Sequence, residues 1–120
     1  MIMCMTGFPG DVIAFECDGR VARGDYENTL VPAVEAALGR YEKVRLYYQT
    51  GHDFSGVEPG VSHDFKLGMD HLLRWERIAI VTNIDWIRET VRAFGFLMPG
   101  VIEIFPLSEA AAARAWILAR

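Results

Sequence analysis

The stretch RIAIVT, residues 77–82, limits the folds open to this chain more than any other segment. It is apolar at almost every position and lacks the alternation of a strand with one wet face. Such runs are typical of a parallel strand that helices cover on both sides. The residues after it form one apolar stripe at spacings of three and four, as on a helix: Ile84, Ile87, Val91, Phe94 and Met98. A buried strand followed by an amphipathic helix predicts an α/β protein, with this strand central in its sheet.

The rest of the chain repeats this alternation. Further strands are expected at residues 12–18, 43–49 and 101–105, and residues 1–5 are expected to pair antiparallel with the first of these through the turn TGFPGD. Helical spacing predicts helices over residues 25–41, 63–75, 84–98 and 107–120. The prediction is one domain over residues 1–120, with a mixed, mostly parallel sheet of about five strands and about four helices.

Short polar residues mark where these helices should begin. Asp25 can cap the first helix, and Ser62 and Ser108 can cap the second and the last. Thr82 and Asp85 have the spacing of a capping box for the third.

Pro32 lies inside the first predicted helix, which leaves two alternatives. Either Pro32 kinks the helix, or residues 25–31 form an irregular first turn and Pro32 begins the regular part of the helix.

Charge and hydropathy exclude two classes of protein. Hydrophobic residues make up 52% of the chain, which supports a folded core, but no run is long enough to span a membrane. The net charge of −4, with basic residues scattered apart from Arg74 and Arg77, argues against nucleic-acid binding. The start of the chain lacks the features of a signal peptide, so a cytoplasmic location is expected.

Cysteine and histidine usage indicates no metal site and no bound cofactor. Cys4 and Cys17 lie in apolar runs and are expected to be small, reduced, buried core residues. The histidines His52, His63 and His71 show no metal-ligand spacing. No nucleotide-binding or nucleophile motif is present either, so the sequence shows no catalytic residue.

The most polar candidate site is the loop over residues 50–61. It contains His52, Asp53 and Ser55 and follows a strand at its carboxyl end, where open α/β sheets bind ligands. The alternative is that this glycine-rich loop is only a connection.

A second candidate is apolar surface near residue 96. Phe94 and Met98 belong to the core stripe, whereas Trp86, Phe96 and Leu97 have no evident place in the core, and Arg88 and Arg92 are expected to point away. Exposed apolar side chains that adjoin one another usually mark an interface or a ligand groove. The alternative is that the loop or the first strand covers them.

Nearly the whole chain resembles the SpoIIAA-like family within the STAS fold of anti-sigma-factor antagonists. The resemblance is carried by YENTLVPAVEAAL (26–38), by KVRLYYQ (43–49) and above all by WERIAIVTNIDWIRETVRAFGFLMPGVIEIFP (75–106). It implies a β-α sandwich with a mixed sheet of four or five strands, in a group of small bacterial proteins, and it makes a homodimer one expected assembly.

The resemblance also implies a comparison at one loop. True antagonists carry an Asp-Ser-Ser-Gly loop whose serine is phosphorylated, and the nearest match here is Asp53-Phe54-Ser55-Gly56, with Phe54 at the modified position. Ser55 or Ser62 would have to take that role for a switch based on added charge.

The interpretation that the residues favour is a non-catalytic, regulatory binding domain. Its partner would be a second copy of the chain, another protein or a small apolar ligand. The alternatives are an enzyme of unrecognised type that uses the loop at residues 50–61, and a phosphorylation-switched antagonist.

Overall fold

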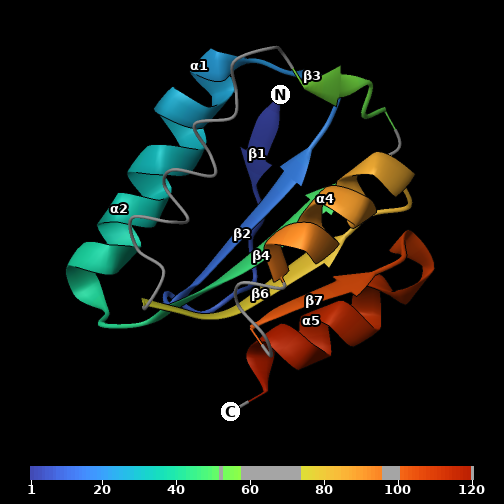
Figure 1. Cartoon of the computed structure of the whole chain (residues 1–120). Helices are drawn as coiled ribbons and strands as arrows, with labels where there is room; N and C mark the ends of the chain where they lie inside the picture. Colours follow the sequence, from blue (N-terminus) through green and yellow to red (C-terminus); the bar gives the residue numbers. More distant parts are fainter. Residues whose placement is uncertain (52, 58–73, 96–100, 120) are drawn as a thin grey trace.

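The computed structural model describes residues 1–51, 53–57, 74–95 and 101–119, and its core is a five-stranded sheet (Figure 1). The strands lie in the order β1-β2-β4-β6-β7. Their bounds are β1 (Ile2–Cys4), β2 (Val12–Cys17), β4 (Val44–Thr50), β6 (Trp75–Val81) and β7 (Ile102–Phe105). β1 is antiparallel to β2 at one edge, and the other neighbours are parallel, which confirms the predicted sheet.

Helices cover the sheet from both sides. They are α1 (Arg23–Asp25), a π-helical turn (Tyr26–Leu30), α2 (Val31–Arg40), α4 (Asp85–Gly95), a 3-10 turn (Leu107–Glu109) and α5 (Ala110–Leu118). From β2 to β4, β6 and β7, every crossover moves in the same direction along the sheet. The strand order therefore never reverses among these four strands, and no crevice of the doubly wound kind opens between them.

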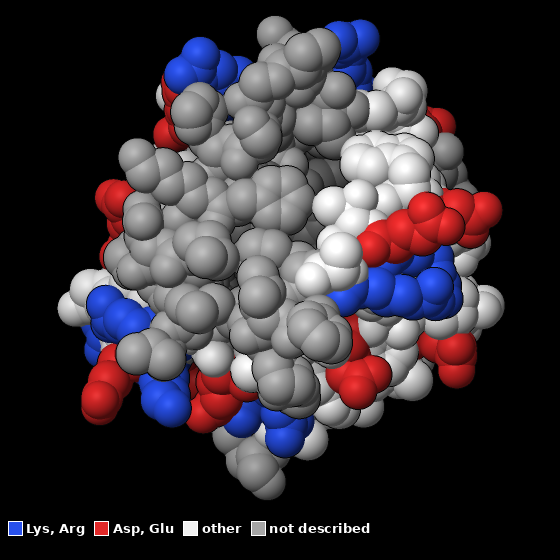
Figure 2. Space-filling view, viewed as in Figure 1, with Lys and Arg blue, Asp and Glu red and all other residues white. Residues whose placement is uncertain are grey.

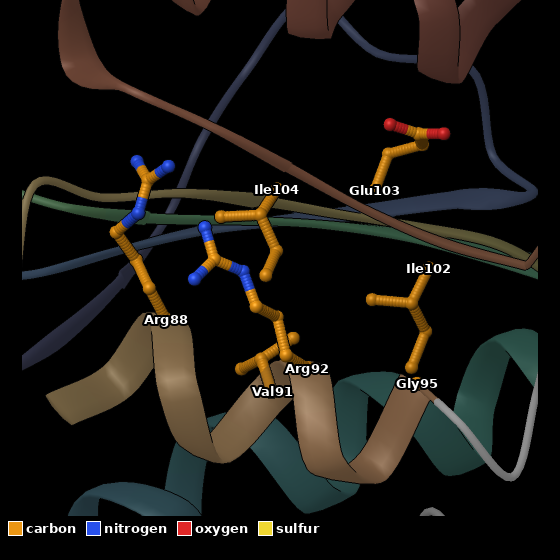
Figure 3. A pocket seen from close by; sticks show the side chains of 7 residues that line it. All are labelled: Arg88, Val91, Arg92, Gly95, Ile102, Glu103 and Ile104. Atoms are coloured by element: carbon orange, nitrogen blue, oxygen red, sulfur yellow. The ribbon is translucent and has the colours of Figure 1, made fainter. Parts of the chain in front are cut away.

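Two hydrophobic clusters lie on opposite faces of the sheet, because successive side chains of a strand point to opposite sides. One cluster joins Phe15 and Val44 to Val34 of α2. The other joins Val81 to Ile117 of α5. Figure 3 shows α4 and α5 on opposite sides of β7. β6 contributes to both clusters, as the run RIAIVT predicts.

The middle of the sheet is nevertheless β4, not β6. The sequence prediction that RIAIVT is central was wrong by one position, because apolar content reports burial and not strand order. β4 is less uniformly apolar because Arg45 and Gln49 point to the α5 face and make specific polar contacts there.

The first helix begins before Asp25, which corrects the predicted cap. Its first residue is Arg23, and the Asp25 carboxylate accepts a hydrogen bond of 2.7 Å from the N–H of Ala22. Pro32 has no N–H that could bond to the carbonyl four residues back. Just before it, the Val31 N–H donates to the carbonyl of Tyr26, five residues back, as in a π-helix. The irregular turn before Pro32 is therefore the correct alternative, in the form of a π-helical turn.

Two other predicted caps are also wrong. α4 begins at Asp85, and the Thr82 hydroxyl accepts from the Ile84 N–H at 3.1 Å instead of capping the helix with a box. Ser108 lies exposed within the 3-10 turn that precedes α5. The predicted cap Ser62 lies outside the described residues.

Three arginines near the amino ends of β4 and β6 donate hydrogen bonds to carbonyls at the C-terminal ends of helices. Arg45 donates to Ile117 O at 2.9 Å and Arg77 to Trp116 O at 2.6 Å, both in α5. Arg74 donates to Leu38 O at 2.6 Å at the end of α2. Cations here satisfy carbonyls that a helix leaves unpaired and complement its dipole. The pair Arg74 and Arg77 therefore has a structural role.

Several short features escaped the sequence analysis. A second sheet pairs β3 (Arg20–Val21) with β5 (Gly56–Val57) in parallel, and two-residue strands carry no readable periodicity. The helix expected over residues 63–75 falls mostly outside the described residues, and Trp75 begins β6 instead.

The two cysteines differ. Cys17 is buried, as expected, but Cys4 is exposed on the edge strand β1, so the prediction of a buried Cys4 was wrong. Among the described helices, none has the length and apolar composition that crossing a bilayer requires.

Candidate functional site

The polar loop after β4 is anchored through its main chain. The Gly19 N–H donates to Asp53 O at 3.0 Å, and the Ser55 N–H donates to Gly19 O at 2.8 Å. The side chains of Asp53 and Ser55 are exposed, and His52 lies outside the described residues. Phe54, the position that the sequence resemblance matches to the antagonists' phosphorylated serine, packs against the core. The structure therefore gives this position a packing role in this chain.

Two carboxylates gather where β2 and β4 end, a feature that the sequence analysis missed. A Cβ added to Gly51 would collide with Asp18 Oδ1 and would lie 2.8 Å from Glu16 Oε1. A side chain at position 51 would therefore have to displace these two carboxylates. The sequence signal for this feature was two acidic residues at alternate positions, Glu16 and Asp18, where a predicted strand ends before a glycine. Within the described ranges, no three His, Cys, Asp or Glu side chains are grouped as a metal site would need.

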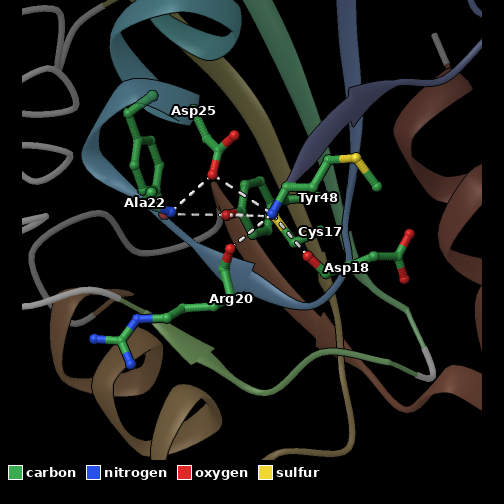
Figure 4. A network of polar contacts seen from close by, with 8 residues as sticks. Cys17, Asp18, Arg20, Ala22, Asp25 and Tyr48 are labelled. Carbon is green, nitrogen blue, oxygen red and sulfur yellow. Dashed lines mark hydrogen bonds and ion pairs between the residues drawn. The ribbon is translucent and has the colours of Figure 1, made fainter.

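A buried hydroxyl and thiol chain lies on the other face at the same end of the sheet. Cys17 Sγ donates to Tyr48 Oη at 2.7 Å, and Tyr48 Oη lies 3.1 Å from Tyr26 Oη (Figure 4). Burial, with the neighbouring Cys17 and Tyr26, raises the pKa of the Tyr48 hydroxyl well above its ordinary value. Tyr48 therefore stays protonated and cannot act as a base near neutral pH.

The amino terminus completes this network from outside (Figure 4). The Met1 ammonium donates to Asp18 O at 2.7 Å and to Arg20 O at 2.8 Å, and it lies 3.5 Å from an Asp25 oxygen. These contacts fasten β1 to the segment that leads into α1. Their partners are main-chain carbonyls and one helix-capping carboxylate, so the arrangement is a structural clasp.

Polar groups at the ends of β4 and β6 also bond to one another. The Thr50 hydroxyl donates to Thr82 Oγ1 at 2.8 Å in a buried position, and Asn83 Oδ1 accepts from the Leu107 N–H at 3.0 Å. These side chains are hydrogen-bonded within the protein, and they stabilise the carboxyl edge of the sheet. They offer little to a substrate.

A pocket of about 320 Å³ lies between α4 and β7 (Figure 3). Its lining consists of Arg88, Val91, Arg92, Gly95, Ile102, Glu103 and Ile104. Arg88 and Arg92 extend toward β7, which corrects the expectation that they point away. Arg88 Nη1 also donates to Thr82 O at 3.2 Å.

Among the residues that the structure describes, no acidic side chain forms an ion pair with either pocket arginine. Across residues 1–51, 53–57, 74–95 and 101–119, the ion pairs join other groups. Two cations one helical turn apart repel each other modestly, and an anion between them would relieve that repulsion. Figure 2 shows that basic and acidic side chains are otherwise interspersed on this side of the molecule.

Trp86 of α4 is 52% exposed, in agreement with the expectation that it has no place in the core. Phe96 and Leu97 lie outside the described residues. Grouping of the three into one apolar surface therefore stays a prediction.

The sequence model of the SpoIIAA-like family matches residues 12–118. The chain belongs to the SpoIIAA-like family. A similar solved structure is an uncharacterised protein of the DUF3478 family from Shewanella loihica PV-4, described as having a SpoIIAA-like fold. It is 22% identical, with a TM-score of 0.72 over 97% of this chain and 93% of that one. No curated protein matches the chain.

The SpoIIAA-like assignment agrees with the observed sheet and confirms the resemblance found from the sequence. At this level of identity the solved relative supports the fold alone. Functional inference for this SpoIIAA-like chain therefore depends on its own side chains.

Proposed function

We propose that this SpoIIAA-like domain is a non-catalytic binding module that engages a protein partner through α4 and the adjoining edge of β7. The observation that carries the proposal is the surface of α4. It presents a half-exposed tryptophan, Trp86, and two arginines, Arg88 and Arg92, that form no ion pair with any acidic residue of the described ranges. Tryptophan and arginine are the residue types enriched at the centres of protein interfaces.

The groups at the carboxyl edge of the sheet support binding over catalysis. An activated nucleophile needs an accessible thiol or hydroxyl beside a base. Cys17 is fully buried and bonded to a protonated tyrosine, and Thr50 is bonded to Thr82. The carboxylates of Glu16 and Asp18 remain the feature that would serve an enzyme of unrecognised type.

Site-specific cross-linking tests the proposal. A photo-reactive phenylalanine analogue in place of Trp86 should capture a discrete protein in cells of the source organism. The matched control carries the same analogue in place of Glu35, an exposed residue of α2. Capture at position 35 with none at position 86, or no protein adduct at either, would contradict partner binding through α4.

A small apolar ligand is the second candidate, because Val91, Ile102 and Ile104 give the pocket an apolar floor. Native mass spectrometry of protein purified from its source distinguishes it. A bound species of a few hundred daltons, retained in the wild type and lost when Ile104 is changed to Asp, would favour the ligand over the protein partner.

A further inference from the structure

The outer edge of β7 has no paired strand among the described residues, and it lies beside the two arginines. The carbonyls of Val101 and Phe105 accept hydrogen bonds from Ile78 and Thr82, so these residues face β6. Alternate residues of a strand direct their N–H and C=O groups to opposite sides. Ile102 and Ile104 therefore direct theirs away from the sheet. In the part of the chain that the structure describes, β7 has no strand on that side.

The side chains of the same two isoleucines point toward α4. In Figure 3, Ile102 and Ile104 extend from β7 toward the helix, Arg88 and Arg92 extend from the helix toward β7, and Glu103 points to the opposite side. The pocket is lined by α4 and β7 and by no residue of β6. It therefore lies over the last strand of the described sheet, between that strand and α4, next to the edge where an added strand would run.

We infer that β7 and α4 form a docking groove for an extended acidic segment of another protein, which adds to the sheet as a sixth strand beside β7. This inference rests on the proposed partner-binding function and names the chemistry of the partner. In such strand addition, main-chain hydrogen bonds supply affinity and alternate side chains supply specificity.

The spacing of the arginines specifies the acidic pattern. Arg88 and Arg92 are four residues apart on α4, a rise of about 6 Å along the helix. Residues i and i+2 of a strand are about 6.6 Å apart and point to the same face. Two acidic residues separated by one residue therefore match the spacing of the two arginines along the helix. The residue between them points to the other face, beside Glu103, where a basic side chain is favoured.

A second copy of this chain fits the groove poorly. Its own acid-x-acid triplets are Glu16-Cys17-Asp18 in the interior strand β2 and Asp25-Tyr26-Glu27 in the first helix. The described edge strands carry no such triplet, since β1 has no acid and β7 has only Glu103. Charge complementarity therefore favours another protein with a free extended segment.

Peptide binding tests the inference. The probe is a capped peptide, Thr-Val-Glu-Lys-Glu-Val-Thr, and binding is measured by titration calorimetry at low salt. A peptide of the same composition with adjacent acids, Thr-Val-Glu-Glu-Lys-Val-Thr, should bind at least about fivefold more weakly. A version methylated at the three central backbone nitrogens should not bind, because it cannot donate hydrogen bonds to β7.

Protein variants locate the contact. Arg92→Gln should weaken binding about tenfold, since charge-assisted hydrogen bonds to carboxylates are the strong ones. Arg40→Gln, a change of the same kind on α2, should have no effect. Amide shifts in the labelled protein should be largest at Ile102 and Ile104 and absent at the other edge, Ile2–Cys4.

The inference is overturned by equal affinity for the two isomeric peptides, by unchanged affinity in Arg92→Gln, or by amide shifts that miss β7. A dimer in sedimentation that Arg92→Glu dissolves would also overturn it, because the occupant would be a second copy. If no peptide binds while the cross-linker at position 86 captures a partner, this inference fails and the proposed function stands. If both experiments are negative, both fail.

Discussion

At the scale of the residue, buried polar side chains on the two faces of β4 affect stability in different ways. Arg45 is 4% exposed and bonds to the C-terminal carbonyls of α5 and to Glu76. Arg45→Ala should lower the free energy of unfolding by about 3 kcal/mol, because carbonyls and a carboxylate lose their buried partner. Urea unfolding measures this, and Arg40→Ala, an exposed arginine on α2, should cost less than about 1 kcal/mol.

Tyr48, on the opposite face of β4, predicts a pH dependence at the same scale. Burial raises the pKa of its hydroxyl in the folded state, whereas the unfolded chain ionises near pH 10. Above pH 10 the folded state therefore holds the extra proton, and stability falls as pH rises, by up to about 1.4 kcal/mol per pH unit from this residue. Below pH 10 this contribution is fully present.

Comparison with Tyr48→Phe isolates this effect from that of Tyr47, whose pKa burial also raises. The difference in unfolding free energy between wild type and Tyr48→Phe should be constant up to pH 10 and should shrink above it. A constant difference up to pH 11.5 would show that the Tyr48 hydroxyl reaches water.

At the scale of the element, β6 has parallel partners on both sides and packs against helices on both faces. Val81 is fully buried on the α5 face. Val81→Asp should unfold the protein at room temperature, because an unpaired buried carboxylate costs several kcal/mol, comparable with the whole stability of about 5–15 kcal/mol. Circular dichroism reports the loss of structure. Glu103→Lys on the edge strand should fold normally, and a folded Val81→Asp would contradict the interior position of β6.

At the scale of the whole molecule, we propose that the chain is one cooperative domain. Its radius of gyration of 13.2 Å is close to the value of about 13.6 Å expected for a compact domain of 120 residues. Calorimetry should therefore show one transition whose calorimetric and van't Hoff enthalpies agree. Two resolved transitions, or a ratio far from unity, would divide the chain into separate units.

Much of the fold could be predicted from the sequence because periodicity is local. The strands around Phe15, Leu46, Ile80 and Ile104 and the antiparallel first strand are all visible in the spacing of apolar residues. Helix starts were less accurate. Thr82 and Asp25 have the composition of caps, but a cap depends on where the neighbouring chain brings its donors, which spacing does not encode.

The sequence by itself determined the alternation of strands and helices, the family and the absence of recognisable catalytic motifs, because each of these is written in neighbouring residues. Only the tertiary structure decided the order of the strands and the partners of individual polar groups. It placed Asp18 and Glu16 around Gly51, and it turned Arg92 from α4 toward β7. Such contacts join residues far apart in the chain, and they depend on how the helices pack across the sheet, which no local pattern records.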